Sequence, residues 1–149
     1  MTPKNRKHPA HGVWDLPCDA GLIVFLTVCT KDRLPWLADP SVHALLRETW
    51  LAADDWKVMR YVLMPDHLHL LCYPSSDGPL ERWVRYWKSS FTQKHKNPDH
   101  RWQTDHWDRR LRGSESLTEK WAYILENPVR YGLVAKSSDW SYQGTLTDP

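Results

Sequence analysis

The chain has 149 residues, of which 41% are hydrophobic and 26% charged, a length that suits one domain with its own core. No apolar run approaches the ~20 residues of a membrane-spanning helix, and no secretory signal opens the sequence; we therefore expect a cytoplasmic protein without a membrane partner. The three cysteines, Cys18, Cys29 and Cys72, include no Cys-x-x-Cys pair, which argues against a structural zinc knot or a disulfide scaffold.

The formal net charge of +2 is unevenly distributed. Residues 1–12 carry three basic side chains and no acidic one, so we expect a flexible basic arm over residues 1–15. Residues 81–112 carry nine basic against four acidic side chains. Such a local excess favours binding to a phosphate backbone, although a solvated charged helix explains it as simply.

The first half of the chain predicts three strands and a helix. Residues 22–29 form a near-continuous apolar run, typical of a central strand that is covered on both faces. Asp39-Pro40 predicts the start of a helix, because an acidic N-cap precedes proline in the first turn. Strands follow at about 57–63 and 66–73, and the short connection between them requires an antiparallel pair.

The second half adds two helices and a strand. Residues 77–79 predict the start of a helix that ends at residues 97–99, and residues 101–108 predict a fourth strand with Trp102 and Thr104 facing inward. Residues 116–119, Ser-Leu-Thr-Glu, are typical of a capping box that opens a last helix.

The order strand, helix, strand, strand, helix, strand predicts an α+β, ferredoxin-like (βαββαβ) fold with an antiparallel sheet and one additional C-terminal helix. The sequence contains neither an internal repeat nor a low-complexity segment. We therefore expect one domain over residues 1–149, with its core in residues 22–142.

Two histidines on the third strand are candidate metal ligands. Side chains alternate along a strand, so His67 and His69 share one face. Two imidazoles on a stiff strand can converge on one divalent ion at little entropic cost. With eight histidines in the chain, such a pair also arises by chance, and the motif alone does not establish a metal site.

The last helix carries a tyrosine away from its apolar face. At 100° per residue, Tyr123 lies about 145° and Asn127 about 105° from the centre of the apolar cluster, and the two side chains point from the same edge. An ordinary exposed tyrosine explains this position equally well. Asn127-Pro128 also suits the N-cap of a short turn that ends at Gly132.

Three stretches together resemble the REP-associated tyrosine transposases, single-tyrosine members of the His-hydrophobic-His nuclease superfamily. They are Met64-Pro-Asp-His-Leu-His-Leu-Leu71, Trp102-Gln103 and Tyr123-Ile-Leu-Glu-Asn-Pro-Val-Arg-Tyr-Gly-Leu-Val134. Residues 25–33 also match the first strand of the family and its polar exit, and the resemblance covers about residues 22–142.

The resemblance implies a ferredoxin-like nuclease core with the tyrosine helix beside the sheet. It implies that His67, His69 and Asn127 bind Mg²⁺ or Mn²⁺ and that Tyr123 is the nucleophile. Family members cut and rejoin single strands near imperfect palindromes that fold as hairpins. The implied partner is therefore single-stranded or hairpin DNA, bound by a monomer or homodimer that is associated with the nucleoid.

Three positions depart from the usual pattern of the family. Asp66 stands where asparagine is more usual, and its carboxylate suits the outer shell of a metal site. Tyr131 stands where the family tends to have alanine, which places a second tyrosine near the first. His106, in the segment 105–108, competes as a metal ligand.

The implied chemistry agrees with the residue types. A phenol has a pKa of about 10, so a tyrosine nucleophile needs its proton removed or its anion stabilised. A divalent ion held by two neutral nitrogens and an amide oxygen would polarise the scissile phosphate. The phosphotyrosine ester conserves the bond energy, which favours strand transfer over degradation. The candidate DNA-binding residues are Arg82, Arg85, Lys88, Arg109, Arg110 and Arg112, assisted by the N-terminal arm.

Two other functions remain open at this point. A metal-dependent phosphodiesterase would use the histidine pair with Asp105 or His106 and no covalent intermediate. A non-catalytic module would bind single-stranded or hairpin DNA with or without a metal. For DNA binding in general, Trp102 or Trp107 could stack on an unpaired base, although a core position is the simpler explanation for both.

Overall fold

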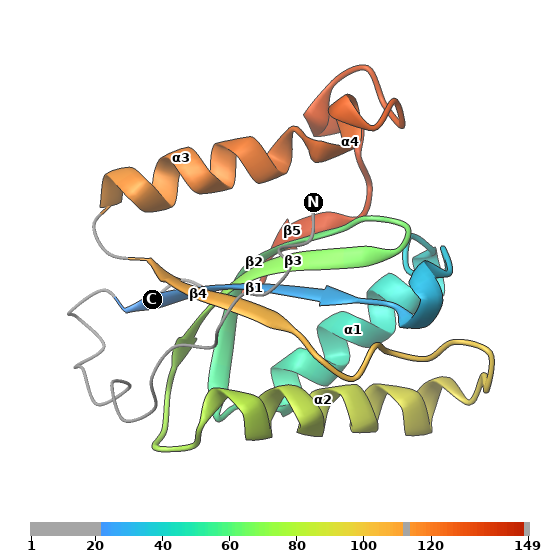
Figure 1. Ribbon diagram of the computed structural model, residues 1–149, viewed down its shortest axis with the longest axis vertical. Coiled ribbons are helices and arrows are strands. Elements are labelled where there is room, and N and C mark those ends of the chain that lie inside the picture. The colour runs from blue at the N-terminus through green and yellow to red at the C-terminus, as the bar shows by residue number, and fades with distance from the viewer. Residues whose placement is uncertain (1–21, 112–113, 148–149) are drawn as a thin grey trace.

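A computed structural model describes residues 22–111 and 114–147, in which a five-stranded sheet has helices on both faces (Figure 1). The strands lie in the order β4-β1-β3-β2-β5, and every pairing is antiparallel. The strands are β1 (Ile23–Cys29), β2 (Trp56–Leu63), β3 (His67–Pro74), β4 (Trp107–Leu111) and β5 (Gln143–Thr145). The helices are α1 (Pro40–Ala52), α2 (Leu80–His95), α3 (Ser114–Leu125) and α4 (Asn127–Arg130), with 3₁₀ turns η3 (Lys31–Arg33) and η4 (Ser137–Asp139).

The predicted α+β, ferredoxin-like fold is confirmed. The first four strands and two helices follow the order βαββαβ, and α3 is the additional helix that carries Tyr123. The sequence explains why α1 begins at Pro40, since the carboxylate of Asp39 accepts hydrogen bonds from the backbone N–H groups of Ser41 and Val42 at 3.0 and 3.2 Å. β1 is buried at every residue, as expected of a central strand.

The two faces of the sheet carry separate hydrophobic cores. Leu68 and Leu70 of β3 lie in the larger core, which packs under α1 and α2. Leu71, on the opposite face, lies in a smaller core with Trp121 and Ile124 of α3. The period of two along β3 therefore distributes its side chains to two different environments.

The fourth strand differs from the prediction. It was expected over 101–108 but covers Trp107–Leu111. Trp102 makes only an isolated bridge with Thr30, because the polar segment after it leaves the sheet and Thr104 is exposed. The expectation that Thr104 faces inward is therefore wrong, whereas Trp102 packs against the larger core.

Two further differences concern the C-terminal part of the chain. α3 begins at Ser114 rather than at residue 116, and β5 was not predicted. The basic arm over residues 1–15 and the candidate Arg112 lie outside the described residues. Within the part of the chain that is described, no helix is long and apolar enough to cross a membrane.

Candidate active site

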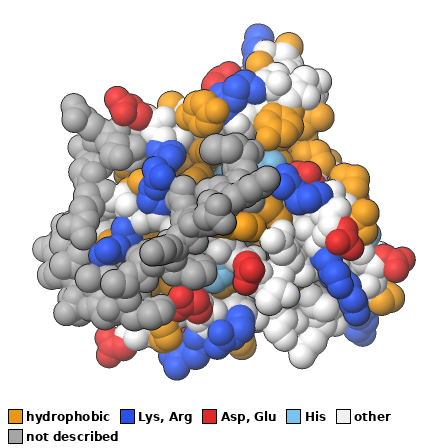
Figure 2. Space-filling view, viewed as in Figure 1, with side chains coloured by type: hydrophobic (Ala, Val, Ile, Leu, Met, Phe, Trp, Pro, Cys, Tyr) orange, Lys and Arg blue, Asp and Glu red, His pale blue; other side chains and the backbone are white. Residues whose placement is uncertain are grey.

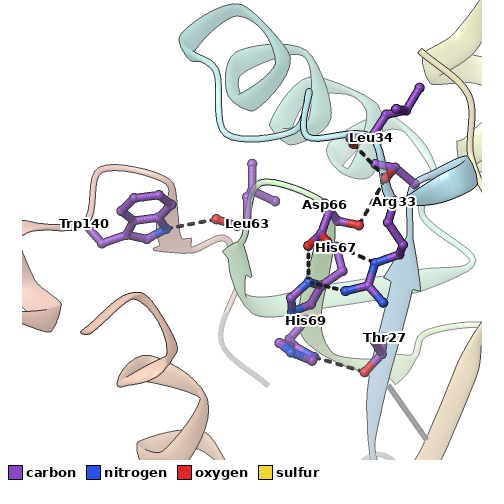
Figure 3. A network of polar contacts seen from close by, with 9 residues as sticks. Thr27, Arg33, Leu34, Leu63, Asp66, His67, His69 and Trp140 are labelled. Carbon is purple, nitrogen blue, oxygen red and sulfur yellow. Dashed lines mark hydrogen bonds and ion pairs between the residues drawn. The ribbon is translucent and has the colours of Figure 1, made fainter. Parts of the chain in front are cut away.

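The two histidines lie side by side on β3, in the interior of the sheet. His67 is 0% and His69 2% exposed, and their ring centroids are 4.9 Å apart. β3 pairs with β1 on one side and with β2 on the other, so the rigid backbone fixes where both rings point. Figure 3 shows the imidazoles beside Thr27 of β1 and the side chains of Asp66 and Arg33. The prediction that both rings share one face is confirmed.

Hydrogen bonding assigns a tautomer to His67. Its Nδ1 lies 2.7 Å from Oδ1 of Asp66 and 3.4 Å from Nη2 of Arg33. The guanidinium of Arg33 can only donate and the carboxylate of Asp66 can only accept, so Nδ1 of His67 cannot hydrogen-bond to both in one tautomer. The shorter contact indicates that Nδ1–H donates to Asp66. The Nε2 lone pair then faces the interior, where the atom is buried without a hydrogen-bond partner among the described residues.

Burial keeps both imidazoles neutral. Burial lowers the pKa of His67 even though the carboxylate of Asp66 opposes it, and the same cause holds the pKa of His69 well below its usual range. Nδ1 of His69 lies 3.0 Å from Oγ1 of Thr27, and its ring stacks on Phe25 at 5.3 Å. Neutral imidazoles oriented through Nδ1 are the form in which histidine binds metals.

A strained turn directs Arg33 towards the site. Asp32 and Arg33 both have φ of 57°, in the left-handed region that costs a non-glycine residue about 1 kcal/mol or more. This turn follows β1, and Nε of Arg33 donates to Oδ2 of Asp66 at 3.1 Å. Sequence reasoning did not identify Arg33 or Thr27 as site residues, and only the polar exit from the first strand indicated this region.

α4 brings a second tyrosine to the histidines. The ring centroid of Tyr131 lies 6.2 Å from that of His67. Tyr123, on α3, is 52% exposed, and no ring contact joins it to either histidine among residues 22–111 and 114–147. The guanidinium of Arg130 covers the Tyr123 ring, with Cζ 3.7 Å from its centroid.

Arg130 also occupies the amide oxygen of Asn127. The same Nη2 donates to Oδ1 of Asn127 and to the backbone carbonyl of Tyr123. Asn127 is 5% exposed and does not cap α4, whose N-cap is Glu126 without a side-chain hydrogen bond. The N-cap interpretation of Asn127 is therefore wrong, because its oxygen bonds to an arginine one turn later.

Sequence comparison decides the family. A protein of Haemophilus influenzae named as a REP-associated tyrosine transposase is 31% identical over 144 residues, covering 86% of this chain and 82% of the relative. The chain belongs to the REP-associated tyrosine transposases. The family member of Escherichia coli K12 is 27% identical over 123 residues, covering 79% of this chain and 73% of its own length. No family profile matches the chain.

Two solved structures share the fold. The structure of a REP-associated tyrosine transposase bound to a REP hairpin has a TM-score of 0.73 at 22% identity, covering 100% of this chain and 95% of that one. A protein of Deinococcus radiodurans described as a transposase has a TM-score of 0.53 at 20% identity, covering 80% and 95%. At such identities the likeness shows the fold alone.

In this chain, an open groove of about 950 Å³ lies beside the histidine site. It runs between α2 and residues 101–105, which precede β4. Its basic lining residues are Lys31, Arg33, Arg85, Lys88 and Arg101. Two acidic residues, Asp32 and Asp105, also line it, so the charge balance is clearly positive. Arg33 belongs to both the groove and the histidine network, and the groove therefore reaches the candidate site.

Lys88 has a structural position inside this groove. Its Nζ donates to the backbone carbonyls of Gln103 and Thr104 at 2.8 and 3.3 Å, and the side chain is only 9% exposed. Burial lowers the pKa of Lys88 to about 8, against the opposing field of Asp105. The ammonium thus holds the segment before β4 against α2, with at most one N–H left for a phosphate.

The remaining candidate DNA-binding residues do not form one surface. Arg82 lies outside the groove and contacts Asp55 at 3.8 Å, whereas Arg109 and Arg110 lie on the edge strand β4. On the face shown in Figure 2, basic side chains lie in separate groups with acidic ones between them.

His106 is buried, at 7% exposure, just before β4. The described residues contain no group of three His, Cys, Asp or Glu side chains that could hold a metal. A ligand set that joins the histidine pair to Asp105 or His106 therefore finds no support.

Proposed function

We propose that this chain nicks and rejoins single-stranded DNA at hairpin-forming sequences through a covalent 5′-phosphotyrosine intermediate on Tyr123. The observation that carries the proposal is the buried Nε2 of His67, an imidazole that burial keeps neutral and that Asp66 orients, on a strand beside α4. Family membership supports transposase chemistry, and a solved relative is bound to a REP hairpin. The site of action would be the cytoplasm, on DNA of the nucleoid.

Each step of the proposed reaction breaks one ester bond to phosphorus and forms another. The Tyr123 phenol attacks the scissile phosphorus, a P–Oη bond forms and the P–O3′ bond breaks. The phenolic proton leaves to solvent, and the departing 3′ oxygen takes a proton from water. In the second step a 3′ hydroxyl attacks the ester, releases the tyrosine and rejoins the strand without an external energy source. Arg130 holds the backbone and the ring of Tyr123 for this attack.

Mg²⁺ or Mn²⁺ would be held by His67, His69 and Asn127. The two imidazoles fit this role, because each uses Nδ1 on a protein partner, Asp66 for His67 and Thr27 for His69, and the unpartnered Nε2 of His67 is a ligand-type atom. Asn127 fits it only if its oxygen is shared with Arg130. When bound, the ion would polarise the phosphate and offset its developing charge.

The groove offers a path for the single strand. Lys31, Arg85 and Arg101 are exposed on its walls, and Arg33 stands where it meets the histidine site. Contacts of this kind neutralise phosphates and set register without reading sequence.

The test is a covalent adduct. A pool of DNA stem–loops with random loops and flanks is incubated with the protein and Mn²⁺ or EDTA, bound species are selected, and adducts are resolved on denaturing gels. We expect an adduct with Mn²⁺ that Tyr123→Phe abolishes while hairpin binding persists. Tyr86→Phe is the matched control, since Tyr86 on α2 is also exposed, at 58%.

Each other outcome would contradict a different part of the proposal. An adduct that survives Tyr123→Phe would show that another residue is the nucleophile. Cleavage without any adduct would indicate a phosphodiesterase, and binding that never leads to cleavage would indicate a binding module.

A further inference from the structure

Tyr131 is held firmly at the end of α4. Its backbone N–H donates to the carbonyl of Asn127 at 2.9 Å, and the turn closes with N–H groups of Gly132 and Leu133 bonded to Val129 and Pro128. Gly132 has φ of 76°, the left-handed conformation that ends helices. The backbone that carries Tyr131 is therefore fixed by hydrogen bonds, and the Tyr131 ring centroid lies 6.2 Å from that of His67.

Core packing does not account for Tyr131. The side chain is 50% exposed and belongs to neither hydrophobic core. A half-exposed tyrosine whose ring lies beside a polar site is well suited to contact a ligand.

Arg33 lies on the same rim of the site. Its side chain is 41% exposed, and its Nε–H is committed to Asp66 at 3.1 Å. Nη2 of Arg33 lies 3.4 Å from Nδ1 of His67, the imidazole that the Tyr131 ring contacts, so the guanidinium and the phenol meet at one histidine. The left-handed turn at residues 32 and 33 fixes this position at a cost in backbone strain.

We infer that Arg33 and Tyr131 form a phosphate clamp beside His67, in which the guanidinium and the phenolic O–H hold non-bridging oxygens of the scissile phosphate. The inference rests on the proposed function and names two further residues of that site. A guanidinium presents several N–H donors in a plane, and a phenol at neutral pH donates one hydrogen bond, so together they match a phosphate anion. Tyr131 is a binding group in this arrangement, and Tyr123 remains the nucleophile.

The test separates phosphate recognition from folding and from chemistry. The stem–loop selected above, with its cleavage position mapped, is made with the natural scissile phosphate or with a neutral methylphosphonate at that position. Binding of each is measured in EDTA for the unaltered protein, Tyr131→Phe, Arg33→Lys and the control Tyr86→Phe. The single-turnover rate with Mn²⁺ is measured separately, and the tyrosine that carries the adduct is identified by peptide mass spectrometry.

We expect Tyr131→Phe to weaken binding of the natural phosphate by about tenfold and leave the methylphosphonate unaffected, since a hydrogen bond to a charged group is lost. Arg33→Lys should keep part of the preference, because it keeps the charge but not the planar fork. Tyr86→Phe should match the unaltered protein, and the adduct should stay on Tyr123.

Three results would overturn the clamp. One is that Tyr131→Phe binds both substrates as tightly as Tyr86→Phe does. Another is an equal loss with both substrates, which would mean that Tyr131 only supports the structure. The third is an adduct on Tyr131. If the unaltered protein forms no adduct with any stem–loop, the proposed function fails; a methylphosphonate placed at each phosphate of the selected stem–loop in turn then decides the clamp from binding in EDTA.

Discussion

The two faces of the sheet divide stability and chemistry between them. The face under α1 and α2 buries large indoles, and Nε1 of Trp56 and of Trp83 donates to the carbonyls of Gly78 and Ala53 at 2.9 and 2.7 Å. The face under α3 has a smaller core and carries the histidine pair. Because both faces share β3, the well-packed side holds the strand rigid while the other side bears polar groups that would weaken a core.

The largest expected effect on stability comes from Trp87, at the centre of the α1 and α2 face. Its ring is fully buried and lies 5.3 to 6.2 Å from the rings of Trp50, Trp83 and Trp102. Trp87→Ala should lower the free energy of unfolding by about 3–5 kcal/mol, measured by urea denaturation. Tyr123→Phe, on the opposite side, should change it by less than about 0.5 kcal/mol.

Trp87→Phe provides the matched control for this prediction. The indole N–H of Trp87 has no hydrogen-bond partner among the described residues, so phenylalanine removes volume but no hydrogen bond and should cost less than alanine. Equal losses of unfolding free energy for Trp87→Ala and Tyr123→Phe would show that stability does not depend mainly on the face under α1 and α2.

The next largest effect is expected at Asp66, on the other face. Asp66→Ala removes the acceptor that orients His67 through Nδ1. The apparent affinity for Mn²⁺ should fall about 10–100-fold, measured by calorimetry on the folded protein. Asp55→Ala, which removes an exposed carboxylate near Arg82, is the control. An unchanged Mn²⁺ affinity would remove Asp66 from the metal site.

The sequence predicted what depends on local pattern. Alternation along β3 placed the histidines on one face, and the Asp39-Pro40 pair gave the start of α1. It did not predict β5, because three residues, Gln143–Thr145, show no periodicity and pair only through tertiary contact with β2. Gly144 fits there because a Cβ would come within 2.8 Å of the Tyr61 hydroxyl.

The contacts of the candidate site that the sequence did not predict depend on backbone conformation, which no residue pattern indicates. Nothing in a lysine-aspartate-arginine segment indicates two left-handed residues, yet that conformation brings Arg33 to Asp66. Likewise, the bond from Arg130 to Asn127 depends on where α3 ends and α4 begins. Tyr131 was noticed only as a departure from the family, and its contact with His67 became visible in three dimensions.

Lys88, on α2, tests whether a buried polar group on the face under α1 and α2 contributes to stability. Lys88→Met removes the hydrogen bonds to the carbonyls of Gln103 and Thr104, which are only partly buried, and should lower the free energy of unfolding by about 1 kcal/mol. Lys94→Met, an exposed position on α2, is the control and should have little effect.

The pH dependence of Lys88→Met sharpens this test. The pKa of Lys88 is about 8 in the folded protein, and an unfolded lysine titrates near 10.4. Between these values the unfolded chain binds more protons, so the unaltered protein should gain stability as pH rises from 8 to 10, and Lys88→Met should lack this gain. Identical pH profiles for the two proteins would show that the ammonium is not buried in solution.

The smallest expected effect concerns the groove and leaves folding unchanged. Arg101 is exposed on the groove wall, whereas Arg60 is exposed on β2 and lies outside it. Arg101→Gln should reduce the slope of log affinity against log salt for a single-stranded oligonucleotide by about 0.7, the value for one phosphate contact, and Arg60→Gln should not. Both variants lose one charge, so a long-range effect of net charge would change both slopes equally. A difference between the two slopes is expected only if the DNA follows the groove. Equal slopes would place the DNA elsewhere on the molecule.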